Sequence, residues 1–118
     1  MQQPLHQIVV CAALAYELLC QLRGAIPNLP ATIGMMACFR IPLSNGYALS
    51  VAIPSDKNRN LAPTDSVDRI TVETALFKGD EIVYDDELGY SDVRVHDFDA
   101  QAILAEYERL KAHLSKQD

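Results

Sequence analysis

Apolar residues dominate the start of the chain and follow a helical rather than an alternating pattern. Residues 5–22 are rich in Ala and Leu and contain neither Gly nor Pro, so they predict a helix. Polar residues fill only a narrow arc of this helix, whereas a surface helix needs just one apolar stripe. We therefore expect cover on several sides, either from a curved sheet of the same chain or from a second subunit. The candidate contacts with a second subunit are Leu5, Val9, Leu14, Leu18 and Leu22.

Alternating apolar residues next predict a β-hairpin. Every second residue from 33 to 43 and from 47 to 53 is apolar, and the residues between the two runs include Asn and Gly, which are typical of a turn. A three-residue loop opposes Ile41 with Leu49 and keeps one face wholly apolar, whereas a two-residue loop does not. We predict the three-residue loop, with Gly46 in the left-handed conformation.

A second hairpin and a short fifth strand are predicted further along the chain. Residues 69–77 are rich in β-branched side chains, and a Lys-Gly-Asp turn leads into the return strand at 81–84. Both faces of this hairpin carry apolar residues, so the pattern leaves its register open. We expect a helix on each side, or a partner, to cover it. Residues 93–95 form the candidate fifth strand.

The last predicted element is an amphipathic helix over residues 100–115. Its apolar residues recur at helical spacing, its charged residues, including Glu106, are assigned to a solvated face, and Asp97 or Asp99 is the expected N-cap. The order is α-β-β-β-β-(β)-α. It predicts a single α+β domain over residues 1–118, in which an N-terminal and a C-terminal helix pack on an antiparallel sheet of four or five strands.

The segment between the two hairpins suggests a possible ligand site. Residues 54–68 show no periodicity, and connections of this length are often functional, although a plain surface loop is the simpler interpretation. As a lid, the loop would close a pocket between the sheet and the N-terminal helix. The polar groups proposed for this pocket are Arg40, Tyr47, Lys57, Arg59 and His96.

The charge of the chain limits its partners. The sequence has 16 acidic and 10 basic residues, a net charge of −6, and residues 65–99 alone hold eleven acidic against three basic residues, a net of −8. Such a protein repels phosphate backbones and anionic membrane surfaces, so we expect neither nucleic acid nor membrane as a partner. A basic protein is the partner that this charge favours, although a solvated acidic surface is the simpler interpretation.

No motif in the sequence predicts a cofactor, a metal ion or a catalytic group. Glycine-rich phosphate loops, zinc-binding pairs and nucleophile elbows are absent. His96 is the one histidine with neighbouring carboxylates, and helix capping explains those carboxylates more simply. The three scattered cysteines do not suggest a disulfide framework, and the apolar residues 8–16 lack the features of a signal peptide, so a cytoplasmic location is favoured.

Two hypotheses about function follow from these observations. The first is a small cytoplasmic binding or interaction protein of unknown specificity that acts as a homodimer, with no catalytic motif evident in the sequence. The alternative is a small-ligand-binding protein or a small enzyme that uses the pocket under loop 54–68.

Overall fold

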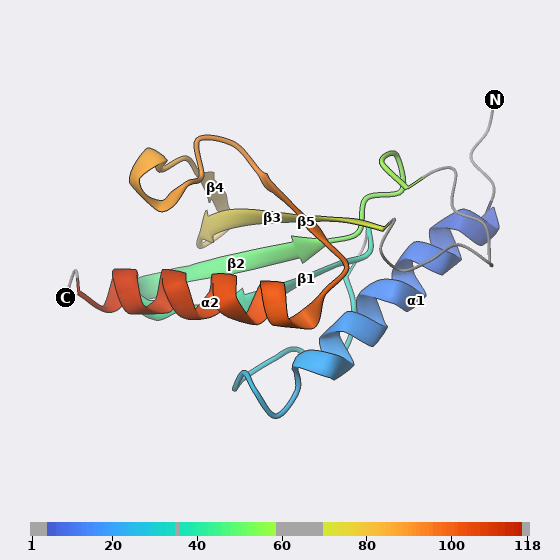
Figure 1. The fold of residues 1–118 in the computed structure, drawn as a ribbon, viewed down its shortest axis with the longest axis horizontal. Helices are drawn as coiled ribbons and strands as arrows, with labels where there is room; N and C mark the ends of the chain where they lie inside the picture. Colours follow the sequence, from blue (N-terminus) through green and yellow to red (C-terminus); the bar gives the residue numbers. More distant parts are fainter. Residues whose placement is uncertain (1–4, 35, 59–69, 117–118) are drawn as a thin grey trace.

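The computed structural model describes residues 5–34, 36–58 and 70–116, with side chains from residue 9 onward (Figure 1). Two helices and five antiparallel strands follow the predicted order, which confirms the α+β fold. The elements are α1 (Leu5–Leu22), β1 (Cys38–Pro42), η1 (Ser44–Gly46), β2 (Tyr47–Ala52), β3 (Thr71–Lys78), β4 (Glu81–Val83), η3 (Asp86–Leu88), β5 (Arg94–Asp97) and α2 (Ala100–Ser115).

The first hairpin has the predicted register. Ile41 lies opposite Leu49, and η1 forms the three-residue turn. The backbone N–H of Leu43 donates to the carbonyl of Tyr47 at 2.8 Å and closes this turn. Gly46 has a φ of 82°, the left-handed conformation expected of it.

The first strand begins later than predicted, at Cys38 rather than at residue 33. Met36 and Ala37 have φ angles of 63° and 51°, and a chain in this left-handed conformation cannot continue a strand. The N–H of Gly34 donates to the carbonyl of Cys38 at 2.8 Å, so the preceding residues fold back on the start of β1. The alternation of residues 33–37 was therefore misleading.

One edge of the sheet is a single strand interrupted by an excursion. β4 and β5 both pair with β3, with Leu76 opposite Val83 and Val72 opposite His96. Residues 84–93 leave the sheet between them, form η3 and close where Asp85 and Tyr90 exchange two backbone hydrogen bonds of 2.8 Å. This excursion explains why alternation alone did not fix the register of the second hairpin.

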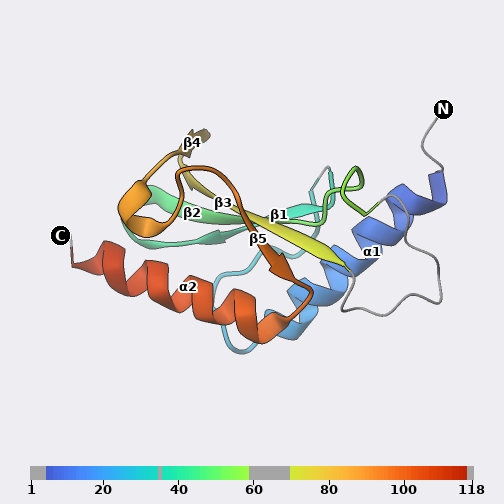
Figure 2. The ribbon, with the colours of Figure 1, turned by 45° about the horizontal axis from the view of Figure 1, so that its top comes forward.

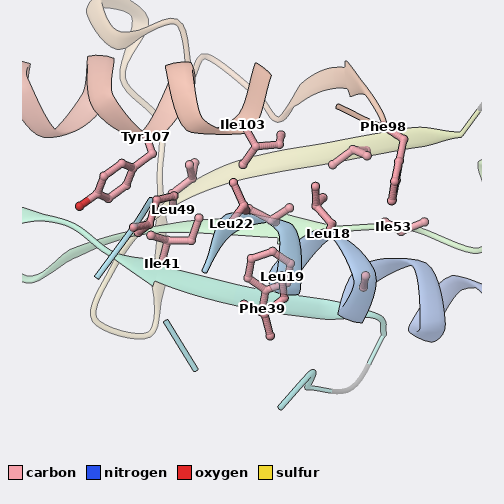
Figure 3. Close-up of a cluster of buried hydrophobic side chains, with 14 of the residues drawn as sticks. Leu18, Leu19, Leu22, Phe39, Ile41, Leu49, Ile53, Phe98, Ile103 and Tyr107 are labelled. Carbon is pink, nitrogen blue, oxygen red and sulfur yellow. The ribbon is translucent and has the colours of Figure 1, made fainter. Parts of the chain in front are cut away.

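Both helices pack on the same face of the sheet (Figure 2). The core between them combines Leu18 and Leu22 of α1 with Ile103 of α2 and inward-facing strand residues such as Ile41 and Leu49 (Figure 3). The predicted helix boundaries are confirmed for α1 and α2. Of the two candidate N-caps, Asp99 caps α2, because its carboxylate accepts a hydrogen bond of 2.9 Å from the backbone N–H of Gln101.

Candidate functional site

The sheet has a face on which no described helix packs, which we call the open face. It consists of alternate strand residues whose side chains point away from the helices. These residues are Cys38, Arg40 and Pro42 of β1, Ala48, Ser50 and Ala52 of β2, Thr71, Glu73, Ala75 and Phe77 of β3, Ile82 of β4, and Val95 and Asp97 of β5.

The open face is mostly apolar, and two of its charged side chains, Arg40 and Glu73, are paired within the chain. Val95 is 61% exposed although its side chain is wholly aliphatic. The guanidinium of Arg40 lies 4.1 Å from the centre of the Phe77 ring and donates to the carbonyl of Gly79 at 3.1 Å. Glu73 forms an ion pair with Lys57. A face of this composition is unusual for a sheet surface in water, which normally carries polar side chains.

A second uncovered surface lies on α1, which extends past the end of the sheet (Figures 1 and 2). Val9 is 58% exposed and Tyr16 is 46% exposed. Among residues 5–16 there is no Asp, Glu, Lys or Arg; the first charged side chain of the helix is Glu17. The apolar helix is thus covered by its own chain along one side, and its outer side meets solvent.

The predicted subunit contacts differ in their exposure to solvent. Val9 belongs to the exposed side of α1, and Leu14 is half-buried against the core. Leu18 and Leu22 are fully buried within this chain, so their apolar character is explained by the core. The side chain of Leu5 lies outside the described part of the molecule.

A buried polar network joins α2 to the sheet, and the sequence pattern misassigned its central residue. Glu106 was placed on a solvated face, but it is only 6% exposed. Position 106 follows Ile103 by three residues and precedes Leu110 by four. Glu106 therefore lies on the same buried side of α2 as these two residues. The prediction was wrong because it relied on the charge of Glu106 and not on its helical spacing from Ile103 and Leu110.

The carboxylate of Glu106 receives hydrogen bonds from two elements. Arg109 donates to it through two nitrogens, at 3.1 and 2.9 Å, and also donates to the carbonyl of Leu88 at 2.8 Å. The hydroxyl of Tyr90, which the excursion inserts into the core, donates to the same carboxylate. Arg94 adds a positive charge at 3.7 Å. The network therefore ties η3, the excursion and α2 together.

The directions of the remaining hydrogen bonds follow from Glu106. Because the Tyr90 hydroxyl donates to a carboxylate, its oxygen accepts from the hydroxyl of Thr74 at 2.8 Å. Thr74 must in turn accept from Nε2–H of His96, also at 2.8 Å. Among the described residues, none forms a hydrogen bond to the other ring nitrogen of His96. His96 is thus held as the tautomer with the proton on Nε2.

Burial, charge and hydrogen bonding shift pKa values in this network, and the hydrogen bond to Glu106 raises the pKa of Arg109. Burial alone would raise the pKa of Glu106, but the hydrogen bonds from Arg109 and Tyr90 and the nearby positive charges outweigh it, so this pKa is lowered. Burial, together with the hydrogen bond to Glu106, raises the pKa of Tyr90. Burial also lowers the pKa of His96, and Arg94 and Arg109 act in the same direction. The network thus holds one buried carboxylate, stabilised by arginines, and a neutral imidazole near neutral pH.

The described residues that were predicted to line a ligand pocket make contacts in different parts of the molecule. Arg40 and Lys57 pair with different acids, Asp80 and Glu73, at the open face. The ring of Tyr47 lies 5.1 Å from the ammonium of Lys78, and His96 belongs to the polar network on the helix side. Arg59 lies outside the described residues, as does most of the predicted lid. No described contact joins any two of these side chains.

The apolar residues on both faces of the second hairpin indicated part of the open face, but the expectation of a helix on each side was wrong, because both helices pack on one face of the sheet. Sequence reasoning also missed most of the polar network. A signal for the open face was present, because Ala48, Ser50 and Ala52 alternate with the core residues of β2 and are all small and uncharged. A strand whose outer side is solvated usually carries charged residues at such positions. The network had a weaker signal, because only Glu106 and Arg109 are neighbours on one helix, whereas Thr74, Tyr90 and His96 come from other parts of the chain.

Within the described ranges, no cluster of three or more His, Cys, Asp or Glu residues is arranged to hold a metal ion. In the same ranges, no helix combines the length and apolar character needed to cross a bilayer. No known protein family matches the chain, and no curated protein or solved structure shows significant similarity to it. The surfaces of the chain itself are therefore the guide to its function.

Proposed function

We propose that this chain is a small interaction protein that functions as a homodimer. The observation that carries the proposal is the grouping of its exposed large apolar side chains. Among the described residues, Val9 and Tyr16 share the outer side of α1 and Ile82 and Val95 lie on the open face, whereas Met36 precedes β1 and Tyr84 lies in the excursion. Apolar side chains that gather on one exposed surface mark interaction sites, and protein–protein contacts are a common class of such sites.

A cytoplasmic location is part of this proposal. The three cysteines are unpaired, and Cys20 is exposed to solvent. Free thiols at the surface are more compatible with a reducing compartment than with an oxidising one.

Sedimentation equilibrium of the wild-type chain over a wide concentration range tests self-association directly. We expect a monomer–dimer equilibrium. Val9→Glu and Val95→Glu each place a charge on one of the two apolar surfaces, and at least one of them should raise the dimer dissociation constant tenfold or more, equivalent to about 1.4 kcal/mol. Gln101→Glu, on the exposed side of α2, is the matched control and should leave the constant unchanged. A wild-type chain that stays monomeric at several hundred micromolar would overturn the proposal.

A further inference from the structure

We infer that a basic, arginine-containing segment of another protein docks on strand β4 and the start of the excursion. We call this region the β4 surface, and its exposed residues are Glu81, Ile82, Tyr84, Asp86 and Glu87. The β4 surface lies away from α1, towards the other end of the sheet (Figures 1 and 2). The basic partner is distinct from the second copy of the proposed homodimer, so neither proposal depends on the other.

Two large apolar side chains of the β4 surface are exposed. Tyr84 is 63% exposed and Ile82 is 39% exposed, and only one residue separates them in the chain. Phe77, which lies opposite Ile82 on β3, already has a partner, because the guanidinium of Arg40 lies 4.1 Å from the centre of its ring. The free apolar surface therefore begins at Ile82 and continues to Tyr84. An exposed aromatic ring beside charged residues is typical of the anchor of a protein–protein contact.

The carboxylates around these two side chains lack internal cations. Residues 79–93 contain six acidic and no basic residues. Asp85 and Asp92 accept hydrogen bonds from backbone N–H groups of the excursion. By contrast, no described residue forms an ion pair or a side-chain hydrogen bond with the three acids of the β4 surface, which are Glu81, Asp86 and Glu87. Like charges this close in the chain repel each other, so charge complementarity selects a basic occupant.

Simpler uses of this surface explain only part of it. Solvation explains the carboxylates but not the exposed Ile82 and Tyr84 among them. A divalent cation would also leave the two apolar side chains unexplained, and among the described residues no group of three acidic side chains is arranged to hold one. A basic protein segment uses both features, because its charges meet the carboxylates while its aliphatic stems cover the apolar side chains.

The chain itself shows how this region recognises a guanidinium. At the turn before β4, Arg40 stacks on Phe77, donates to the carbonyl of Gly79 at 3.1 Å and lies 3.9 Å from the carboxylate of Asp80. The β4 surface offers the same combination of an aromatic ring and carboxylates, but no described cation stacks on the ring of Tyr84. An arginine of the partner can fill this place, since a guanidinium stacks on a ring and donates to a carboxylate at the same time. A lysine ammonium is a less complete match.

The neighbours of Tyr84 hold it in place before any partner arrives. Val83 on one side packs against the core, and Asp85 on the other side exchanges two backbone hydrogen bonds of 2.8 Å with Tyr90. The side chain of Asp85 also accepts the backbone N–H groups of Glu87 and Leu88, which fixes η3. Little backbone ordering is therefore needed on binding. Because the surface is small and its charges are exposed, we expect a dissociation constant in the micromolar range that rises with salt.

The experiment uses a short fluorescein-labelled peptide in which Arg alternates with Ser, together with two matched peptides that carry Lys or Glu in place of Arg. Fluorescence anisotropy against the wild-type chain should show that the Arg peptide binds more tightly than the Lys peptide and that the Glu peptide does not bind. Tyr84→Ala should weaken binding of the Arg peptide about fivefold. Tyr16→Ala, which removes an exposed tyrosine of α1, is the matched control and should leave the affinity unchanged.

A pair of triple variants separates the local surface from the net charge of the chain. Neutralising the three acids of the β4 surface, with Glu81→Gln, Asp86→Asn and Glu87→Gln, should weaken binding of the Arg peptide about tenfold at low salt and reduce its salt dependence. The matched control neutralises three exposed acids elsewhere, with Glu17→Gln, Asp97→Asn and Glu108→Gln, and should change the affinity much less. Circular dichroism confirms that each variant is folded.

Three results would overturn the inference. Equal losses of affinity for the two triple variants would mean that net charge alone attracts the peptide, and an unchanged affinity for Tyr84→Ala would mean that the ring is not an anchor. If Tyr84→Ala instead raises the dimer dissociation constant in sedimentation equilibrium and leaves peptide binding unchanged, a second copy occupies the surface. Failure of the Arg peptide to bind the wild-type chain at low salt also rejects the basic partner, but it leaves the proposed homodimer standing, because self-association is measured without the peptide.

Discussion

Glu106 keeps its charge inside the molecule because Arg109, Arg94 and Tyr90 surround its carboxylate. Removing the carboxylate would leave a buried hydroxyl and a half-buried guanidinium without their acceptor. We expect Glu106→Ala to lower the free energy of unfolding by about 3 kcal/mol, measured by urea denaturation. Glu108→Ala, which changes an exposed carboxylate on the same helix, should stay within about 0.5 kcal/mol. Equal losses for the two variants would show that the network contributes nothing particular to stability.

His96 makes stability depend on pH. Its pKa in the folded chain lies below the ordinary 6.5, chiefly because it is buried, with Arg94 and Arg109 acting in the same direction and Glu106 and Asp97 against it. The unfolded chain therefore binds a proton first as the pH falls. The contribution of neutral His96 is fully present above pH 6.5 and is lost as the pH falls towards the folded-state pKa.

Substitution of His96 tests whether this residue causes the pH dependence of stability. His96→Gln keeps a donor for Thr74 but does not titrate, so the decline in unfolding free energy below pH 6.5 should be smaller in this variant than in the wild type. His113→Gln is the matched control and should retain the wild-type decline. Urea denaturation at a series of pH values measures both, and parallel curves for wild type and His96→Gln would contradict the assignment.

At the scale of elements, the excursion between β4 and β5 depends on a glycine whose surroundings are crowded. Gly89 and Gly46 have similar φ angles, 84° and 82°, but a Cβ at Gly89 would lie 2.7 Å from the guanidinium of Arg94, whereas one at Gly46 would meet nothing within 4 Å. Gly46→Ala should therefore cost about 1 kcal/mol of unfolding free energy from backbone strain alone. We expect Gly89→Ala to cost more, because it also displaces Arg94 from Glu106.

A double-mutant cycle checks this explanation. In an Arg94→Ala background the steric conflict is removed, so the cost of Gly89→Ala should fall to that of Gly46→Ala. If urea denaturation shows that Gly89→Ala still costs more unfolding free energy than Gly46→Ala in that background, contact with Arg94 does not cause the difference.

Some of these elements could be predicted from the sequence and others could not. Both helices and the first hairpin were predictable, because each depends on contacts between residues near one another in the chain, such as Ile41 with Leu49. The start of β1 was mispredicted because backbone conformation at Met36 and Ala37, not side-chain pattern, ends the strand there. The partners of Glu106 come from β5 and the excursion as well as α2, and no periodicity within one segment reports such contacts.

At the scale of the whole molecule, net charge opposes the proposed self-association while apolar contact favours it. Two chains of net charge −6 repel each other, and salt screens that repulsion over about 8 Å at physiological ionic strength. Arg40 and Glu73 on the open face are already paired within each copy, so they offer few attractive ion pairs between copies for salt to weaken. We therefore expect the homodimer to tighten as NaCl rises from low to moderate concentration.

A complex with a basic protein would show the opposite dependence, because its attraction would come from the acidic residues that are concentrated between residues 65 and 99. Sedimentation equilibrium at several NaCl concentrations distinguishes the two. A severalfold lower dimer dissociation constant at high salt fits apolar contact between two acidic chains. A dissociation constant that rises with salt would show that charge, rather than the apolar surfaces, holds the dimer together.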